Sequence, residues 1–292
     1  MVCHLIKAQL SIIIILTTLV SFAQKDFQGQ AYYESKTTVD MSNFGGGQLS
    51  EERKKQIAER MRNNLEKSFV LTFNQTESIY KEEEKLEAPG QGGGGRFGMM
   101  MSSLIGGDQY KNVKDKLFLQ EQDLFGKQFL VKDSLEVLEW QLGSETRTIG
   151  QYTCFKATAV REVPDIGFGR FGRRPENEQA KDSTATNPDA REQDDIPLKE
   201  VVVTAWYTPQ IPVNQGPDKY WGLPGLILEV NIDRTTILCS KIVLNPSEKE
   251  NLKVPSKGKE ITQADYDILV KEKTEEMRAN FRNRGGRDGR RR

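Results

Sequence analysis

The sequence predicts a mainly β protein, an α+β fold in which an antiparallel sheet of about ten short strands is covered by one early and one late helix. Short runs rich in Val, Ile, Phe, Tyr and Thr recur along the chain and are separated by Gly, Asn and Asp, which is typical of strands joined by turns. Strands do not alternate with helices, as a parallel sheet requires. We therefore expect an open antiparallel sheet, or one that curves into a half-barrel.

The first half of the chain carries the early helix and five expected strands. The helix spans residues 50–67, where Ser50 is a suitable N-cap. Ile57, Met61 and Leu65 recur on one side of it, so this stripe is expected to pack on the sheet. The strands are expected at residues 26–40, 69–73, 77–81, 116–119 and 128–131.

The second half carries five more expected strands and the late helix. The strands are expected at residues 137–140, 152–157, 200–206, 226–232 and 235–244. Asp233 and Arg234 separate the last two strands and predict a tight hairpin. The late helix is expected to begin at Thr262, because Asp265 follows three residues later in a relation that resembles a capping box.

Residues 1–23 have the pattern of a secretory signal peptide. Lys7 precedes an apolar run over residues 10–20, which is too short for a comfortable membrane span. Ser21 and Ala23 supply small residues at the −3 and −1 positions, which predicts cleavage between Ala23 and Gln24. Gln24, and not a Cys, directly follows the cleavage point, and no later apolar run is long enough to cross a membrane. The mature chain is therefore expected to be exported, not to be a lipoprotein, and to have no transmembrane segment.

Residues 24–281 are expected to form a single β-rich domain that contains two segments of unusual composition. Residues 89–107 hold eight Gly and three consecutive Met, which predicts a flexible loop. Residues 164–197 are rich in charged residues and Pro, and they offer too little apolar surface to offset the entropy of ordering. This segment is predicted to be a disordered insertion, and residues 282–292, with six Arg, a disordered tail.

Composition argues against several classes of function. Lys plus Arg equals Asp plus Glu at 42 each, whereas a dedicated nucleic-acid binder needs a basic face. The one His, His4, lies in the predicted signal peptide, so no mature imidazole serves a catalytic triad or a metal site. Residues 90–95 and 167–172 match G-x-G-x-x-G, but neither match precedes a predicted helix. We expect no cofactor, no metal and no enzymatic activity.

Two Cys remain after cleavage, Cys154 and Cys239, and both lie in expected strands. In an oxidising compartment they can form a disulfide. Two buried free thiols are the alternative, and the sequence leaves both open.

The densest pattern in the chain lies between residues 205 and 229, which contain four of the eleven Pro and two of the three Trp. Such a stretch follows a rigid path rich in turns. Its aromatic residues either close over an apolar core as a structural plug or present a binding surface. The candidate surface residues are Trp206, Tyr207, Tyr220 and Trp221.

Six consecutive residues within this stretch carry a family resemblance: Gly222, Leu223, Pro224, Gly225, Leu226 and Ile227. They resemble the signature of the GLPGLI family, exported proteins found mainly in Bacteroidetes-type bacteria. Residues 149–157 and 205–217 also resemble the family pattern, so the resemblance covers most of residues 24–281. It implies a location in the periplasm or outer envelope of a two-membrane cell. It supplies no catalytic residues, because the family has no established activity.

Three functions follow as hypotheses. The leading one is a non-enzymatic envelope protein that binds another protein through the aromatic stretch. Residues 198–204 resemble a string near the start of TonB-dependent receptor plugs, which suggests a transporter as the partner. The second hypothesis is a carrier that holds a lipophilic ligand in a half-barrel cavity. The third is a hydrolase that uses only carboxylates.

Overall fold

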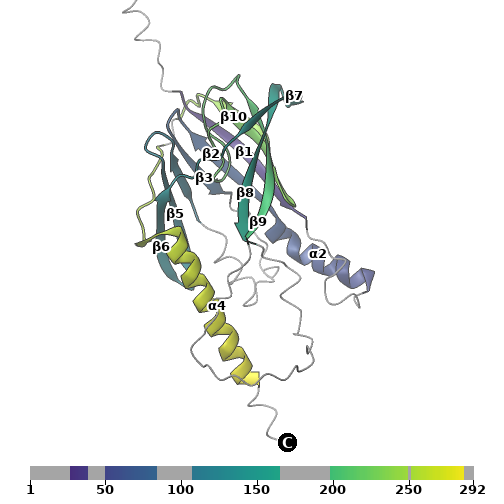
Figure 1. Ribbon diagram of the computed structural model, residues 1–292, viewed down its shortest axis with the longest axis vertical. Helices are drawn as coiled ribbons and strands as arrows, with labels where there is room; N and C mark the ends of the chain where they lie inside the picture. Colours follow the sequence, from purple (N-terminus) through teal and green to yellow (C-terminus); the bar gives the residue numbers. More distant parts are fainter. Residues whose placement is uncertain (1–26, 39–49, 84–106, 165–197, 249–250, 286–292) are drawn as a thin grey trace, which may run out of the picture.

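The computed structural model describes residues 27–38, 50–83, 107–164, 198–248 and 251–285. Within these ranges, twelve strands form one sheet and two helices flank it (Figure 1). The mainly β fold class is therefore confirmed. The strands are β1 (Gly29–Thr37), β2 (Glu66–Phe73), β3 (Glu77–Glu82), β4 (Gln109–Asn112), β5 (Leu117–Leu124), β6 (Lys127–Ser134), β7 (Gln141–Ile149), β8 (Tyr152–Pro164), β9 (Leu198–Thr208), β10 (Leu226–Ile232), β11 (Thr235–Leu244) and β12 (Lys259–Ile261).

The sheet is open and has the order β12-β6-β5-β4-β3-β2-β1-β11-β10-β9-β8-β7. The first strand lies in the middle, where β1 pairs antiparallel with both β2 and β11. Neighbouring strands are antiparallel throughout, except that the short β12 pairs parallel with β6. Figure 1 shows the sheet strongly curved, with β5 and β6 on one side and β8 and β9 on the other. β1 thus joins a first half-sheet, formed by β2 to β6 and β12, to a second half-sheet, formed by β7 to β11.

The prediction missed two short strands, β4 and β12, and placed a third strand at the wrong residues. β4 and β12 have only four and three residues and no alternating pattern that would reveal them. The strand expected at 137–140 is wrong, because these residues form a connection and β7 begins at Gln141. Leu138 and Trp140 are apolar because they pack against the main core. β7 is an edge strand with mostly exposed side chains, so its sequence lacks a buried face.

The early helix, α2 (Glu51–Leu65), has the predicted N-cap, but it does not pack on the sheet as predicted. The Ser50 side chain accepts a hydrogen bond from the Arg53 amide at 3.4 Å. The chain passes directly from Leu65 into β2, with no turn to fold the helix back. Figure 1 accordingly shows α2 extending away from the end of β2, so α2 does not cover the sheet as we expected.

The late helix, α4 (Gln263–Gly285), begins where the sequence predicted. Thr262 Oγ1 accepts from the Asp265 amide at 3.1 Å and donates to Asp265 Oδ2 at 2.8 Å. Tyr266, Leu269 and Val270 pack in one cluster with Phe129 and Val131 of β6. The helix continues to Gly285, so residues 282–285 are helical and not part of a disordered tail as predicted, and residues 286–292 lie outside the described ranges.

The remaining domain predictions fall mostly on residues outside the described ranges. The signal peptide at 1–23 lies wholly outside these ranges. The Gly/Met-rich segment at 89–107 is described only at Gly107, and the insertion at 164–197 only at Pro164. No helix of the described ranges has both the length and the apolarity needed to cross a membrane.

The two faces of the sheet differ in what covers them. We call the face of Tyr33, Leu71 and Val203 the inner face, where these side chains are fully buried. Residues 209–225, which connect β9 to β10 and are named the plug segment, pack there in the main core. The opposite, outer face carries Tyr32 and Val70, which are only partly buried.

Candidate functional site

The six-residue motif joins the plug segment to the start of β10. The Gly225 amide donates to the Leu223 carbonyl at 2.8 Å, which makes a tight turn at Pro224. The amides of Leu226 and Ile227 then donate to Ile211 and Gln215, both at 3.0 Å. The motif thus holds the plug segment against the sheet, which is a structural role.

Gly225 lies too close to the neighbouring strand for any side chain. A Cβ atom at Gly225 would lie 2.2 Å from the carbonyl oxygen of Thr208 and 2.8 Å from the nitrogen of Pro209. Gly225 also has a positive φ of +158°. Only glycine permits this approach of two backbone segments.

The four aromatic residues predicted as a binding surface do not form one. Trp206, Tyr207, Tyr220 and Trp221 are all buried, with exposed fractions of 9%, 6%, 2% and 9%. Trp206 follows Ala205 of the inner face, so the alternation of the strand places it on the outer face. The binding-surface prediction is therefore wrong, and the plug interpretation describes the inner-face residues.

Polar partners satisfy the buried indole groups of this region. Trp221 Nε1 donates to the Glu136 carbonyl at 2.6 Å, and Trp140 Nε1 donates to the Trp221 carbonyl at 2.8 Å. On the outer face the Arg147 guanidinium lies 4.3 Å from the centre of the Trp206 ring. Each ring is thus held by a specific partner, as buried Trp side chains usually are.

A buried lysine anchors the plug segment from the opposite half-sheet. Lys111 of β4 is fully buried, and its Nζ donates to the carbonyls of Gly216 at 2.5 Å and Tyr220 at 3.1 Å. Burial lowers the pKa of this amine to about 7, with Asp218 acting in the opposite direction. No local pattern marks Lys111, because it lies in a strand of only four residues, between Tyr110 and Asn112.

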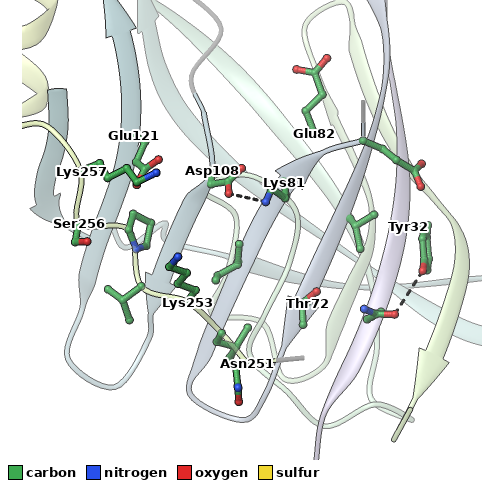
Figure 2. Close-up of a pocket in the computed structure, with 17 residues that line it drawn as sticks. Tyr32, Thr72, Lys81, Glu82, Asp108, Glu121, Asn251, Lys253, Ser256 and Lys257 are labelled. Carbon is green, nitrogen blue, oxygen red and sulfur yellow. Dashed lines mark hydrogen bonds and ion pairs between the residues drawn. The ribbon is translucent and has the colours of Figure 1, made fainter. Parts of the chain in front are cut away.

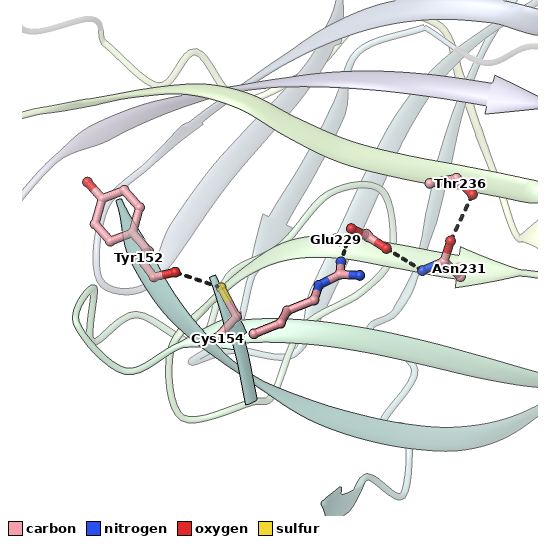
Figure 3. A network of polar contacts seen from close by, with 6 residues as sticks. Tyr152, Cys154, Glu229, Asn231 and Thr236 are labelled. Atoms are coloured by element: carbon pink, nitrogen blue, oxygen red, sulfur yellow. Dashed lines mark hydrogen bonds and ion pairs between the residues drawn. The ribbon is translucent and has the colours of Figure 1, made fainter. Parts of the chain in front are cut away.

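A polar network on the outer face ties β7 to β10 and β11 (Figure 3). Arg147 pairs with Glu229, which accepts from Asn231 Nδ2 at 2.6 Å. Thr236 Oγ1 donates to Asn231 Oδ1 at 2.8 Å. Each of these four side chains contacts another one, although Arg147 Nε is buried without a hydrogen-bond partner among the described residues, so the network joins strands.

Cys154 and Cys239 are buried free thiols. Cys239 pairs opposite Tyr33 on the inner face, whereas Cys154 pairs opposite Arg147 on the outer face. Two strands, β9 and β10, separate them in the sheet. The disulfide that the sequence left open is therefore not formed. Burial raises the pKa of Cys154 to about 11 and that of Cys239 to about 12, so neither is a ready nucleophile.

A cleft of about 570 Å³ opens on the outer face of the first half-sheet (Figure 2). Its floor is formed by side chains of β1, β2 and β3: Gln30, Tyr32, Val70, Thr72, Ile79 and Lys81. Its wall is residues 251–257, which we name the strap and which cross this face of the sheet ahead of β12. The volume is in the range of sites that hold small ligands or peptide side chains.

The strap is held to the sheet by few contacts. Pro255 is buried and Leu252 is partly buried, while the other strap residues are exposed. Among the described residues, no hydrogen bond joins the strap backbone to the sheet before the pairing of Lys259 with Phe129. Within the described ranges, the strap therefore lies outside the strand ladder of the sheet until Lys259.

The carboxylates of the cleft fall into two groups. Asp108 pairs with Lys81 at 3.0 Å, and Glu82 pairs with Lys67 at 2.6 Å. Within the described ranges, the side chains of Glu83 and Glu121 have no ion-pair partner within 4.0 Å. Glu121 is only partly exposed, and its backbone is fixed by bonds to Gly107 and Asp108. The cleft therefore holds a carboxylate with a fixed backbone position, together with the strap lysines Lys253 and Lys257.

Sequence reasoning did not find this cleft. Its residues come from β1, β2, β3, β5 and the strap, as well as from the chain just before β4. No single segment contains a motif, and the run Glu82–Glu84 has the pattern of an ordinary solvated stretch. The hint of a transporter partner does not concern the cleft either, because residues 198–204 lie in β9 between β8 and β10.

The comparisons with known proteins bear on the second half-sheet. Residues 140–229 match the family described as "Protein of unknown function (Porph_ging)". This range runs from the start of β7 into β10 and includes the whole plug segment with its six-residue motif. No curated protein matches the chain.

Solved structures give a distant likeness. Two crystal forms of PNGF-II, in space groups C2 and P21, each share 12% identity with this chain at a TM-score of 0.44, over 84% of this chain. This chain spans about a third of the length of PNGF-II, with 32% and 33% of that chain covered.

Proposed function

We propose that the protein is an exported, non-enzymatic accessory protein of the cell envelope, of the GLPGLI type, that binds another envelope protein through the strap cleft. Export and envelope location are supported by the signal-like pattern of residues 1–23 and by the motif at residues 222–227. The match of residues 140–229 to an uncharacterised family of Bacteroidetes-type bacteria agrees with this proposal.

The observation that carries the binding role is the construction of the cleft. On the inner face, the buried Lys111 is fully used in holding the plug segment. The strap, by contrast, lies outside the strand ladder and borders the cleft that Glu121 also lines. A surface that the fold does not need for its own stability is available for a partner.

The alternative of a lipophilic carrier finds less support. A half-barrel carrier needs an apolar cavity on the inner face, and there the plug segment inserts Ile211, Leu223 and Tyr220, each nearly or fully buried. The outer cleft mixes lysines and carboxylates with its apolar floor, which suits a polar ligand better than a lipid chain.

Site-specific photo-crosslinking tests the proposed function. A photoreactive amino acid at Ser256 in the strap is expected to form an adduct with a discrete envelope protein when the full chain is expressed in a two-membrane host. The control position is Val137, which is 60% exposed and lies in the connection before β7. Mass spectrometry identifies the adduct. The same adducts from both positions, or none from Ser256, would argue against the cleft as the binding site.

A further inference from the structure

We propose that two copies of this chain pair edge to edge through β7, antiparallel and with Thr146 on the two-fold axis, so that their sheets form one continuous sheet. β7 ends the second half-sheet, whereas the strap cleft lies over β1 and the first half-sheet. The contact uses no residue that lines the cleft, so it is independent of the proposed function.

The two edges of the sheet differ in how they are covered. At one edge, the short β12 pairs with β6. At the other edge, β7 pairs with β8 and, among the described residues, with no other strand. Figure 1 shows β7 at the margin of the second half-sheet, and all of its residues except Arg147 and Ile149 are exposed. Such an edge presents unpaired backbone groups to which a further strand can be added.

The hairpin between β7 and β8 determines which backbone groups of β7 face outward. Ile149 ends β7 and is followed by a two-residue turn, so it exchanges hydrogen bonds with β8. Because this pattern alternates, the amides and carbonyls of Thr148 and Thr146 point away from β8. The Thr153 amide, opposite Thr148, fits the pattern, since it donates to Gln210 Oε1 at 3.1 Å and not to β7.

The charges of β7 select a second copy as the partner. Charged side chains usually keep edge strands apart. The charged residues of β7 are Glu145 and Arg147, which have opposite signs and flank Thr146. When two β7 strands pair antiparallel about Thr146, Glu145 of each copy lies opposite Arg147 of the other and on the same face. Opposite charges in directly opposed positions stabilise a strand pair. In the same register, Ser144 lies opposite Thr148.

Both charged side chains are placed for this contact within a single copy. The Glu145 side chain is 65% exposed and lies 2.8 Å from Lys156 Nζ. Arg147 pairs with Glu229 through one nitrogen, Nη2, and its guanidinium lies over the Trp206 ring. A guanidinium carries several N–H donors, so it can receive a second carboxylate. The internal contacts hold both side chains in position, which reduces the entropy lost when the two copies associate.

A charge-exchange experiment tests the dimer. Sedimentation velocity of the purified full chain is expected to show a dimer whose fraction rises with protein concentration. Glu145→Arg and Arg147→Glu each place like charges opposite each other, so each variant alone should associate about tenfold more weakly. An equal mixture of the two variants restores opposite charges in both positions and should form a heterodimer. The control Gln141→Arg, at an exposed position of β7 outside the facing residues, should leave the dimer unchanged.

Cysteine cross-linking tests the register without a change of charge. Thr146→Cys places two thiols opposite each other on the two-fold axis, where the Cα atoms lie about 5.5 Å apart, within reach of a disulfide. Mild oxidation should therefore link two copies of this variant. Ser144→Cys is the matched control, because its counterpart is Thr148, and it should link far fewer copies.

The outcomes decide both the surface and the register. A protein that stays monomeric and gives no cross-link from Thr146→Cys overturns the proposal. A dimer that both charge variants retain, or one that cross-links equally from both cysteine positions, shows that another surface or register is used. Circular dichroism checks that each variant is folded. If a charge variant is not folded, the two cysteine variants decide between these results.

Discussion

Alanine in place of Gly225 is expected to destabilise the protein by about 4 kcal/mol or more, or to prevent its folding. The new Cβ would lie 2.2 Å from the carbonyl oxygen and 2.5 Å from the carbonyl carbon of Thr208, which are backbone atoms at the end of β9. A flexible side chain could move aside, but this backbone is fixed by the pairing of Thr208 with Leu226. Urea unfolding followed by circular dichroism measures the loss.

Gly150→Ala is the matched control for this experiment. Gly150 has a φ of +59°, yet nothing lies within 4 Å of the position of its Cβ. Its substitution therefore costs only the backbone strain, on the order of 1–2 kcal/mol. Equal losses for the two variants would show that the close approach of Gly225 to β9 does not contribute.

The stability of the protein is expected to rise with pH above 7 in a way that depends on Lys111. Burial lowers the pKa of the folded amine from 10.5 to about 7. In the window between these two pKa values the unfolded chain holds more protons than the folded protein, so raising the pH favours the folded state. Below pH 7 the amine is protonated in both states and this dependence disappears.

The variant Lys111→Met isolates the contribution of this amine to the pH dependence of stability. The free energy of unfolding of the wild-type protein should increase, relative to that of the variant, by about 1 kcal/mol per pH unit between pH 7.5 and pH 9.5. Other groups that titrate in this range are common to both proteins and cancel in the difference. Lys132→Met, at a half-exposed lysine paired with Glu260, should follow the wild-type curve. Parallel curves for the wild type and Lys111→Met would contradict the buried, deprotonated amine.

Local signals predicted much of this fold, because the relevant physics acts over a few residues. The cap at Thr262 and the hairpin at Asp233 depend on neighbours in the sequence, and both are found in the structure. Strands with a buried face, such as β11, show the alternation that predicts them. β7 lies at the edge of the sheet and has no buried face, so its sequence shows no alternation. The apolar run at 137–140 was therefore predicted as the strand in its place.

The site could be predicted only in part, because it depends on contacts between distant segments. The motif at residues 222–227 marked a region of importance, but its pattern could not decide whether the aromatic residues were buried. Lys111 and Gly216 are 105 residues apart, and their hydrogen bond has no trace in either local sequence. The cleft likewise brings Tyr32, Glu121 and the strap together only through the order of the strands.

Hydrogen–deuterium exchange of the purified protein tests most directly whether the plug segment is core and the strap is the accessible binding element. Amides of the plug segment donate to backbone carbonyls, as Val213 and Gly222 do, so residues 209–225 should exchange slowly. Amides of the strap, residues 251–257, should exchange within seconds, because they have no backbone acceptor among the described residues. Rapid exchange in the plug segment together with a protected strap would contradict the account.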